Sequence, residues 1–325
     1  MKIDFHRIKR AAVGIKNKIE SLLRVVVLPG FHGMPLYDVL RYFVQGFTRG
    51  YLLDRAAAVA FNVFLAIFPS IMVLFTLLPY LPLHDLQVVL VNTIVEFLPA
   101  TVADKVVNTL TEIISLQHNG LLSLGVIMAF YFSSGATRAF IRGFDMGVNH
   151  VGEMKGIKIH LNGLLVTLLI GALIIISLCA IIIGNDVLPW IFTKIHFYNR
   201  FVIVLLNFGQ WLLTVFSLLA SVAILYHYGN SRKEKFKLFT PGSIVFAAMF
   251  IVGTLGFNYY IVNFSRYNAL YGSIGVLIIF LLWLYVNCII ILIGNELNVS
   301  ILAAEQRSKC LEESRGGLIE EGGKD

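Results

Sequence analysis

Six uninterrupted apolar stretches constrain this chain more than any other feature of its sequence. Each is close to the roughly 20 residues that a helix needs to cross the hydrocarbon core of a bilayer. They cover residues 57–80, 120–140, 161–183, 201–226, 242–262 and 272–294. Backbone groups in lipid must bond within their own segment, so continuous stretches of this kind predict helices rather than a barrel. The sequence therefore predicts an all-α integral membrane protein with six transmembrane helices.

The composition agrees with a membrane protein and excludes an ordinary soluble domain. Hydrophobic residues make up 58% of the 325 residues and charged residues 14%, whereas soluble domains carry about 25% charged residues. The net charge of +7 could suggest nucleic acid, but basic residues in a membrane protein mark its cytoplasmic loops. No combination of aromatic and basic residues suited to stacking bases is present, so we expect no nucleic-acid partner.

Lys and Arg alternate between many and few along the segments that connect the apolar stretches. From the N-terminus to the C-terminus these segments hold ten, one, four, two, four, one and four of them. Basic segments remain in the cytoplasm, so both termini are predicted to lie inside. This orientation requires an even number of crossings, which agrees with six stretches.

Two further segments have the apolar periodicity of a helix without the length to span. In "LYDVLRYFVQGF" at 36–47, apolar residues recur at helical spacing opposite charged ones. This segment predicts either an interfacial helix on the cytoplasmic leaflet or a helix packed against the underside of the bundle. Residues 102–113 repeat the pattern and predict a helical outer loop.

The chain divides into three regions on this reading. Residues 1–55 form a basic cytoplasmic segment that contains the amphipathic helix, and residues 56–304 form the six-helix transmembrane domain. Residues 305–325 are acidic and contain Gly, which predicts a mobile cytoplasmic tail. The sequence "TPGS" predicts the start of the fifth span, with Thr240 as N-cap and Pro241 as the first helical residue.

A polar stripe runs along the fourth span. Its members fall at spacings of three and four residues and therefore share one helix face: Asn207, Gln210, Thr214, Ser217 and Ser221. Such a face avoids lipid, so it either joins helices by hydrogen bonds or lines a wet cavity. Asn62 adds a polar group within the first span. With the two amides included, these residues are candidates for a substrate path.

A second stripe, which includes two Arg residues, crosses the end of the second span. Its members share a face if the helix continues past the membrane: Ser134, Arg138, Arg142, Asp145 and Asn149. The two guanidinium groups could hold a phosphate or a carboxylate. The alternative is a local Arg142–Asp145 pair with Arg138 reaching toward lipid headgroups.

Polar residues also crowd the end of the last span. Asn287 lies within it, and Gly294, Glu296 and Asn298 follow near its cytoplasmic end. An ionisable residue along a membrane helix suggests a functional site, although a structural ion pair fits equally well. We expect the partner of Glu296 to be Arg55 or Arg138, because both should lie at the same depth. Asn287, Glu296 and Asn298 complete the candidate substrate path.

Enzymatic motifs and metal-binding patterns are missing from the sequence. No phosphate-binding loop, zinc-protease motif, nucleophile elbow or dinucleotide fingerprint occurs. The eight His residues have no metal-ligand spacing, and the three Cys residues show no pairing pattern. We therefore expect no catalytic residues, no metal, no cofactor and no disulfide.

Several segments together resemble the YihY/BrkB virulence-factor family. They are "RAAAVAFNVFLAIFPS", "FSSGATRAF", "TPGS" and "YGSIGVLIIFLLWLYVNCIIILIGNELN", and the similarity covers residues 37–304. The resemblance implies a bacterial inner-membrane protein with about six helices and no agreed catalytic residues. Some members carry the label ribonuclease BN, a misassignment. Asn295 departs from the family, which often has Ala at this position.

Two functions of different classes follow. The first is a transporter or export protein for an amphiphilic or anionic substrate, for example a lipid. The second is a scaffold that organises the envelope without transport. Membrane lipids are the expected partners in either case, together with envelope proteins or a second copy of the chain, and ribonuclease activity is not expected.

Overall fold

The computed structural model is helical throughout the part of the chain that it describes. This part comprises residues 20–49, 51–77, 119–146, 156–182, 200–230, 236–263 and 273–321, and it contains no strand. The helices are α2 (Leu36–Arg49), α3 (Leu52–Leu77), α6 (Asn119–Asp145), α7 (Ile157–Ile182), α9 (Arg200–Gly229), α10 (Pro241–Asn263) and α12 (Ser273–Glu321). The helical outer loop expected at 102–113 lies outside the described residues.

Within the described residues, six helices are long and apolar enough to cross a membrane. They are α3, α6, α7, α9, α10 and α12, and they coincide with the six predicted stretches. The predicted six-helix membrane fold is therefore confirmed. The orientation, with both termini inside, stays a prediction from the charge pattern.

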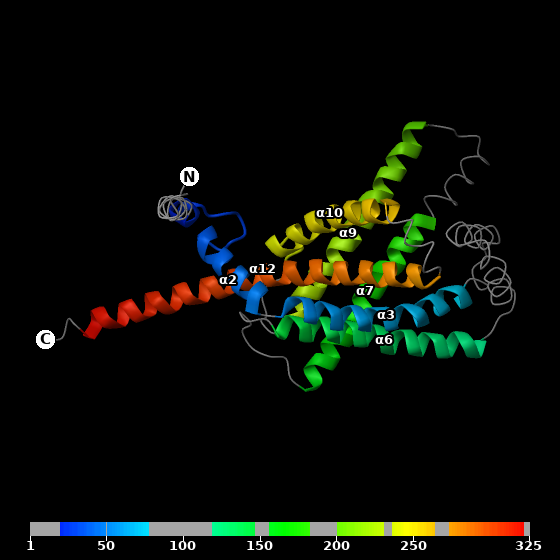
Figure 1. Cartoon of the computed structure of the whole chain (residues 1–325), viewed down its shortest axis with the longest axis horizontal. Helices are drawn as coiled ribbons and strands as arrows, with labels where there is room; N and C mark the ends of the chain where they lie inside the picture. Colours follow the sequence, from blue (N-terminus) through cyan, green and yellow to red (C-terminus); the bar gives the residue numbers. More distant parts are fainter. Residues whose placement is uncertain are drawn as a thin grey trace, which may run out of the picture.

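The last helix is longer than predicted. α12 continues without a break from Ser273 to Glu321 and projects beyond the other helices (Figure 1). Lys309 Nζ lies 2.6 Å from Glu305 Oε1, an i, i+4 pair that supports helix beyond the apolar stretch. The tail therefore begins as a helical extension of α12, and its mobility stays a prediction.

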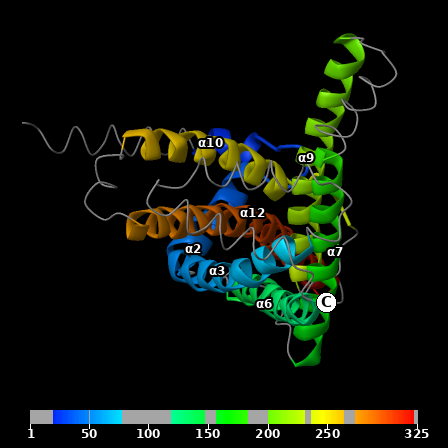
Figure 2. The same ribbon diagram turned by 90° about the vertical axis from the view of Figure 1, so that its right-hand side faces the viewer.

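The spanning helices contact one another in neighbouring pairs. α3 lies beside α6, α7 beside α9, and α10 beside α12, while α12 also contacts α3 and α2, and α6 also contacts α7. In both views, α7 and α9 run at a steep angle to the other four spans (Figures 1 and 2). α12 thus lies among the other elements, and the α7–α9 pair crosses them.

Burial is concentrated at one end of this bundle, which we call the packed end. It is the end where α3, α7 and α10 begin and where the sequence expects the cytoplasm. The buried side chains of α3 lie between Leu52 and Ala66, and those of α12 between Cys288 and Ala304. The core includes Phe144, Val166, Phe246 and Leu292. The spans are therefore held together mainly through the halves that meet there.

α2 packs against the part of α12 that leaves the membrane. Val39 is fully buried and forms a small cluster with Phe31, Ile301 and Ala304. Leu36 and Phe43 are half-buried against the core, whereas Leu40, Val44 and Phe47 are exposed. The predicted amphipathic helix is confirmed, and one side of it covers the packed end. Its location at the membrane interface stays a prediction, which the exposed apolar side favours.

Candidate functional site

A buried ion pair between α3 and α12 occupies the packed end. Arg55 Nη2 lies 3.3 Å from Glu296 Oε2, and Arg55 Nη1 donates a 2.7 Å hydrogen bond to the carbonyl of Gly143. Only 6% of Arg55 and 2% of Glu296 is exposed. The last carbonyls of a helix lack partners within it and carry partial negative charge, so Arg55 also caps α6. Arg55 is confirmed as the partner of Glu296.

Gly46 of α2 lies against this ion pair. A Cβ atom at position 46 would overlap the carboxylate of Glu296 and would meet Oε1 first. Among the described residues, that oxygen and Arg55 Nε are buried and have no hydrogen-bond partner. α2 therefore covers the oxygen of Glu296 that Arg55 does not reach, and only glycine permits this approach.

Two asparagines of α12 bind the ends of neighbouring helices. Asn298 Oδ1 accepts a 2.8 Å bond from the backbone N–H of Gly242, and its Nδ2 donates to Thr240 Oγ1. Asn295 Oδ1 accepts from Asn230 Nδ2, which also donates to the carbonyl of Tyr226 near the end of α9. These side chains satisfy backbone groups that helix ends leave open.

The start of α10 follows the sequence prediction. Thr240 Oγ1 accepts a 3.1 Å bond from the backbone N–H of Ser243, and the helix begins at Pro241. Ser243 is fully buried, and its hydroxyl donates to the carbonyl of Leu238. The predicted N-cap is confirmed, and Asn298 adds a second acceptor from a different helix.

A close approach of three helices accompanies these bonds. The hydroxyl of Tyr226 in α9 donates a 2.7 Å bond to the carbonyl of Ile291. A Cβ atom at Gly294 would collide with this hydroxyl and with the carbonyl of Gly242 in α10. Gly294 therefore lets α9 and α10 reach α12 together.

The second-span stripe is only partly assembled. Arg138 Nη1 donates to Ser134 Oγ at 3.2 Å, so these two do share a face. α7 passes close to Arg138, because a Cβ atom at Gly163 would overlap its aliphatic stem. Arg142 is exposed, and the described part of the chain contains no ion pair between Arg142 and Asp145. Asn149 lies outside the described residues.

The fourth-span stripe joins helices where its bonds are described. Ser217 Oγ donates a 3.0 Å bond to the carbonyl of Leu173 in α7. Thr214 and Ser221 donate to carbonyls four residues earlier in α9, those of Gln210 and Ser217. The side chain of Asn207 lies outside the described part of the chain. For Ser217 the arrangement favours the interhelical alternative, and a path along the stripe stays a prediction.

The two amides predicted within the first and last spans bond to their own helices. Asn62 Nδ2 donates to the carbonyl of Ala58, and Asn287 Nδ2 to the carbonyl of Trp283. Each bond satisfies an amide hydrogen within its own helix. A polar group without such a bond would have a larger desolvation cost in lipid. A role for either residue in a substrate path stays a prediction.

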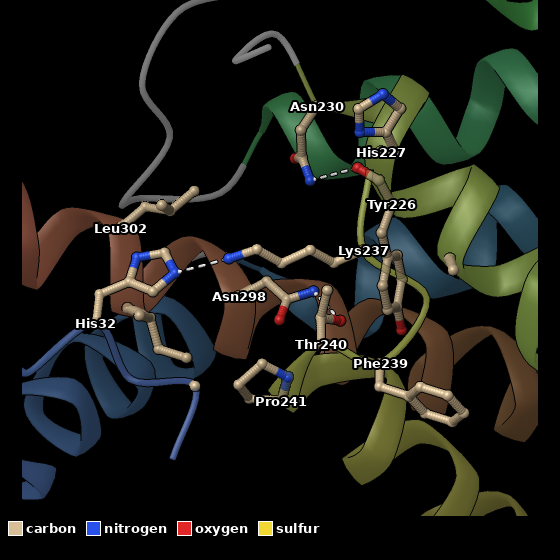
Figure 3. Close-up of a pocket in the computed structure, with 13 residues that line it drawn as sticks. His32, Tyr226, His227, Asn230, Lys237, Phe239, Thr240, Pro241, Asn298 and Leu302 are labelled. Atoms are coloured by element: carbon tan, nitrogen blue, oxygen red, sulfur yellow. Dashed lines mark hydrogen bonds between the residues drawn. The ribbon is translucent and has the colours of Figure 1, made fainter. Parts of the chain in front are cut away.

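A pocket of about 110 Å³ opens beside these contacts (Figure 3). Four segments line it: the loop before α2, the end of α9, residues 237–241 and α12. Its polar lining residues include His32, His227, Asn230, Lys237, Thr240 and Asn298. Of the predicted path residues, Asn298 lies on this pocket. The two His residues and Lys237 were not predicted, because they come together only in the folded chain.

His32 reaches the pocket from a tight turn. Its φ is 51°, and the flanking Gly30 and Gly33 also have positive φ values of 88° and 79°. His32 Nδ1 lies 2.8 Å from Glu305 Oε2, and Lys237 Nζ lies 3.4 Å from His32 Nε2 (Figure 3). The segment "GFHG", with a glycine on each side of His32, is the sequence feature that could have indicated a tight turn at His32.

Metal and cysteine chemistry gain no support from the geometry. The described residues contain no group of three His, Cys, Asp or Glu side chains that could hold a metal ion. Cys288 is buried, whereas Cys179 and Cys310 are exposed, and none of the three forms a disulfide within the described part of the chain. The site that the structure does bring together is one of charge pairs, helix caps and a basic pocket.

Comparisons with known proteins agree with this membrane architecture. The family model described as virulence factor BrkB matches residues 43–315. The chain is 25% identical over 245 residues to the ribonuclease-like protein YfkH of Bacillus subtilis, covering 75% of this chain and 88% of that protein. It is also 24% identical to a UPF0761 membrane protein of Aggregatibacter aphrophilus, covering 82% and 92% of the two chains.

A UPF0761 membrane protein of Coxiella burnetii is 26% identical over 271 residues, which cover 78% of this chain and 90% of that protein. No solved structure matches the chain. The family match covers most of the sequence, and the expected inner-membrane location is consistent with it. The six apolar helices and this match together show that the chain is a multi-pass membrane protein of the BrkB virulence-factor family.

Proposed function

We propose that this protein translocates an anionic amphiphile across the membrane. The observation that carries the proposal is the unequal packing of the bundle. The halves of α7 and α9 remote from the packed end are exposed over much of their surface, including Ile174, Val204, Phe208 and Trp211. Membrane helices associate through close packing, so the contacts that hold this pair to the other spans are concentrated at the packed end.

The α7–α9 pair is joined within itself, and α7 is tied to α6 in the packed half by the hydroxyls of Thr137 and Thr167, which lie 2.9 Å apart. Ser217 of α9 bonds to the carbonyl of Leu173 in α7, while the pair crosses the other spans steeply (Figure 2). Translocation requires two arrangements of a bundle around one route. A bundle packed at one end, with one helix pair loosely held at the other, suits such a change better than a uniformly packed scaffold does.

The class of substrate follows from the side chains beside the pair. Exposed apolar residues cover its outer surface, which suits a lipid tail. Arg138 lies under α7, and its guanidinium bonds only to the neutral hydroxyl of Ser134 within the described chain. An Arg without a carboxylate partner, placed in a membrane span, attracts an anionic headgroup.

A lipid-movement assay tests the proposal. The protein is placed in vesicles of phosphatidylethanolamine and phosphatidylglycerol that contain a trace of NBD-labelled phosphatidylglycerol, and dithionite bleaches the label in the outer leaflet. We expect label from the inner leaflet to become accessible, more slowly with Arg138→Gln than with the exposed control Arg307→Gln. Equal protection in empty vesicles and in vesicles containing folded protein would refute translocation of this lipid class.

Thiol accessibility tests the route along α9. In a Cys-free background, Cys at 207, 210 and 214 should react with a small hydrophilic reagent if the stripe lines a water-filled path. The neighbours Leu212 and Leu213, changed to Cys, should remain unreactive. Uniform protection along the helix would leave the stripe as a set of helix contacts only.

A scaffold is the second candidate, favoured by a different observation. α12 extends beyond the bundle as a helix that other proteins could contact (Figure 1). Its partner would be an envelope protein or a second copy of this chain. Photocrosslinking from Arg307 in cells should then give one discrete adduct, while vesicles containing the protein show no movement of labelled lipid.

A further inference from the structure

The pocket beside α10 has an excess of positive charge. Lys237 Nζ contacts the ring of His32, and no carboxylate contacts Lys237 among the described residues. Among the described residues, the acidic side chain that contacts His32 is Glu305, which is shared between His32 and Lys309. Two lysines therefore face one carboxylate here, which leaves a positive charge on the pocket side.

A second imidazole is held beside the pocket without using its nitrogens. The ring of His227 makes edge-to-face contacts with Tyr228 and Phe236, at centroid distances of 4.8 and 5.5 Å. Within the described chain neither of its ring nitrogens has a hydrogen bond. His227 is thus oriented by aromatic contacts and free to donate a proton to an anionic ligand.

The start of α10 does not account for the charge on its own. The backbone N–H groups of Gly242 and Ser243 are already bonded, to Asn298 and Thr240. A ligand would therefore be held by the Lys237 and His227 side chains rather than by the end of the helix. A water needs about 10–15 Å³ of accessible space, so a pocket of about 110 Å³ accepts a larger group such as phosphate.

The rim of the pocket indicates where the ligand comes from. Phe236 and Phe239 flank Lys237 in the sequence, and they are 50% and 65% exposed. They lie where α9 has ended and α10 begins its span, so they are expected at the membrane interface. Aromatic side chains at this level anchor in the headgroup region, and a lysine between them can reach a lipid phosphate.

We propose that this pocket binds the phosphate group of an anionic phospholipid from the leaflet at the packed end. Lys237 pairs with the phosphate, His227 donates a hydrogen bond, and Phe236 and Phe239 lie among the lipid chains. The inference does not depend on translocation, because a lipid that only occupies the pocket would satisfy it.

Native mass spectrometry of the full chain in detergent tests the pocket with phosphatidylglycerol as the probe. Lys237→Gln should weaken binding about fivefold, the effect expected for one basic residue at a membrane surface. Arg307→Gln is the control, because it removes one positive charge from the exposed part of α12 outside the pocket and outside the Glu305 contacts. Phe239→Ser should also weaken binding of the lipid, and it tests the rim without changing any charge.

The outcomes separate the possible ligands. The proposal holds if Lys237→Gln and Phe239→Ser both lose lipid while Arg307→Gln binds like the wild type. It is overturned if all three variants bind phosphatidylglycerol equally. It is also overturned if inorganic phosphate displaces the lipid and Phe239→Ser has no effect, because the pocket then takes a free anion. Failure of the lipid-movement assay would leave this result unchanged.

Discussion

Gly46 and Glu296 lie in direct contact, one on the amphipathic helix α2 and the other on α12 at the packed end of the bundle. The carboxylate fills the space in which a Cβ atom at position 46 would stand. Glu296 cannot move aside freely, because Arg55 holds its other oxygen at 3.3 Å. α2 therefore packs directly against the ion pair. A substitution that disrupts either the α2 contact or the ion pair should weaken the other.

Gly46→Ala should destabilise the protein by about 1–3 kcal/mol, the usual cost of overpacking a buried site. Thermal unfolding in detergent measures the loss. Gly171→Ala is the matched control, since a Cβ atom at that helical glycine meets nothing within 4 Å. Equal melting temperatures for the two variants would contradict the close approach of α2.

Glu296→Gln should lower the melting temperature, because it leaves Arg55 buried beside a neutral group. Breaking a buried pair costs about 3–5 kcal/mol, and less where water reaches it. Adding Arg55→Gln should then cost far less than Arg55→Gln does in the wild type. Independent, additive losses in this cycle would mean that the two side chains do not interact.

Asn298→Ala should cost more stability than Asn287→Ala. The first removes bonds to Gly242 and Thr240 on another helix and leaves a buried N–H without its acceptor, a loss of about 1–3 kcal/mol. The second removes only a bond to a carbonyl of its own helix. Chemical unfolding of the two variants in detergent compares them, and the reverse order would refute the capping role of Asn298.

Both termini should lie in the cytoplasm. In a Cys-free background, Cys introduced at Asp104 should react with an impermeant maleimide in intact cells, and Cys at Ser231 should react only after the cells are opened. The reason is the low number of basic residues between the first and second spans. Labelling at Ser231 but not at Asp104 would invert the proposed orientation.

The membrane fold could be predicted because it depends on local properties of the sequence. An apolar stretch of sufficient length must form a helix in lipid, and Thr240 with Pro241 marks a helix start by its own chemistry. The pairing of Glu296 with Arg55 could also be predicted, from the membrane depth at which the two residues are expected. Few charges can lie at the same membrane depth, so the number of possible partners is small.

The rest depends on packing that no single segment encodes. No feature of the sequence around Gly46 marks it as a contact residue. Its role appears only when α2 packs against α12. The pocket combines His32, His227 and Lys237 from three separate segments. The continuation of α12 into the tail was not predicted, because the Gly and acidic residues there favour a mobile segment while the Glu305–Lys309 pair favours a helix. The mobility of the tail stays a prediction.

The central place of α12 has a consequence for biosynthesis. It follows the other five spans in the chain, yet polar groups from α3, from α10 and from the end of α9 bond to it: Arg55, Tyr226, Asn230 and the backbone N–H of Gly242. A nascent chain with five inserted spans holds these donors without their acceptors. A chain truncated before α12 would therefore carry these polar groups without the partners that α12 supplies, so the packed end can form only after α12 has been inserted.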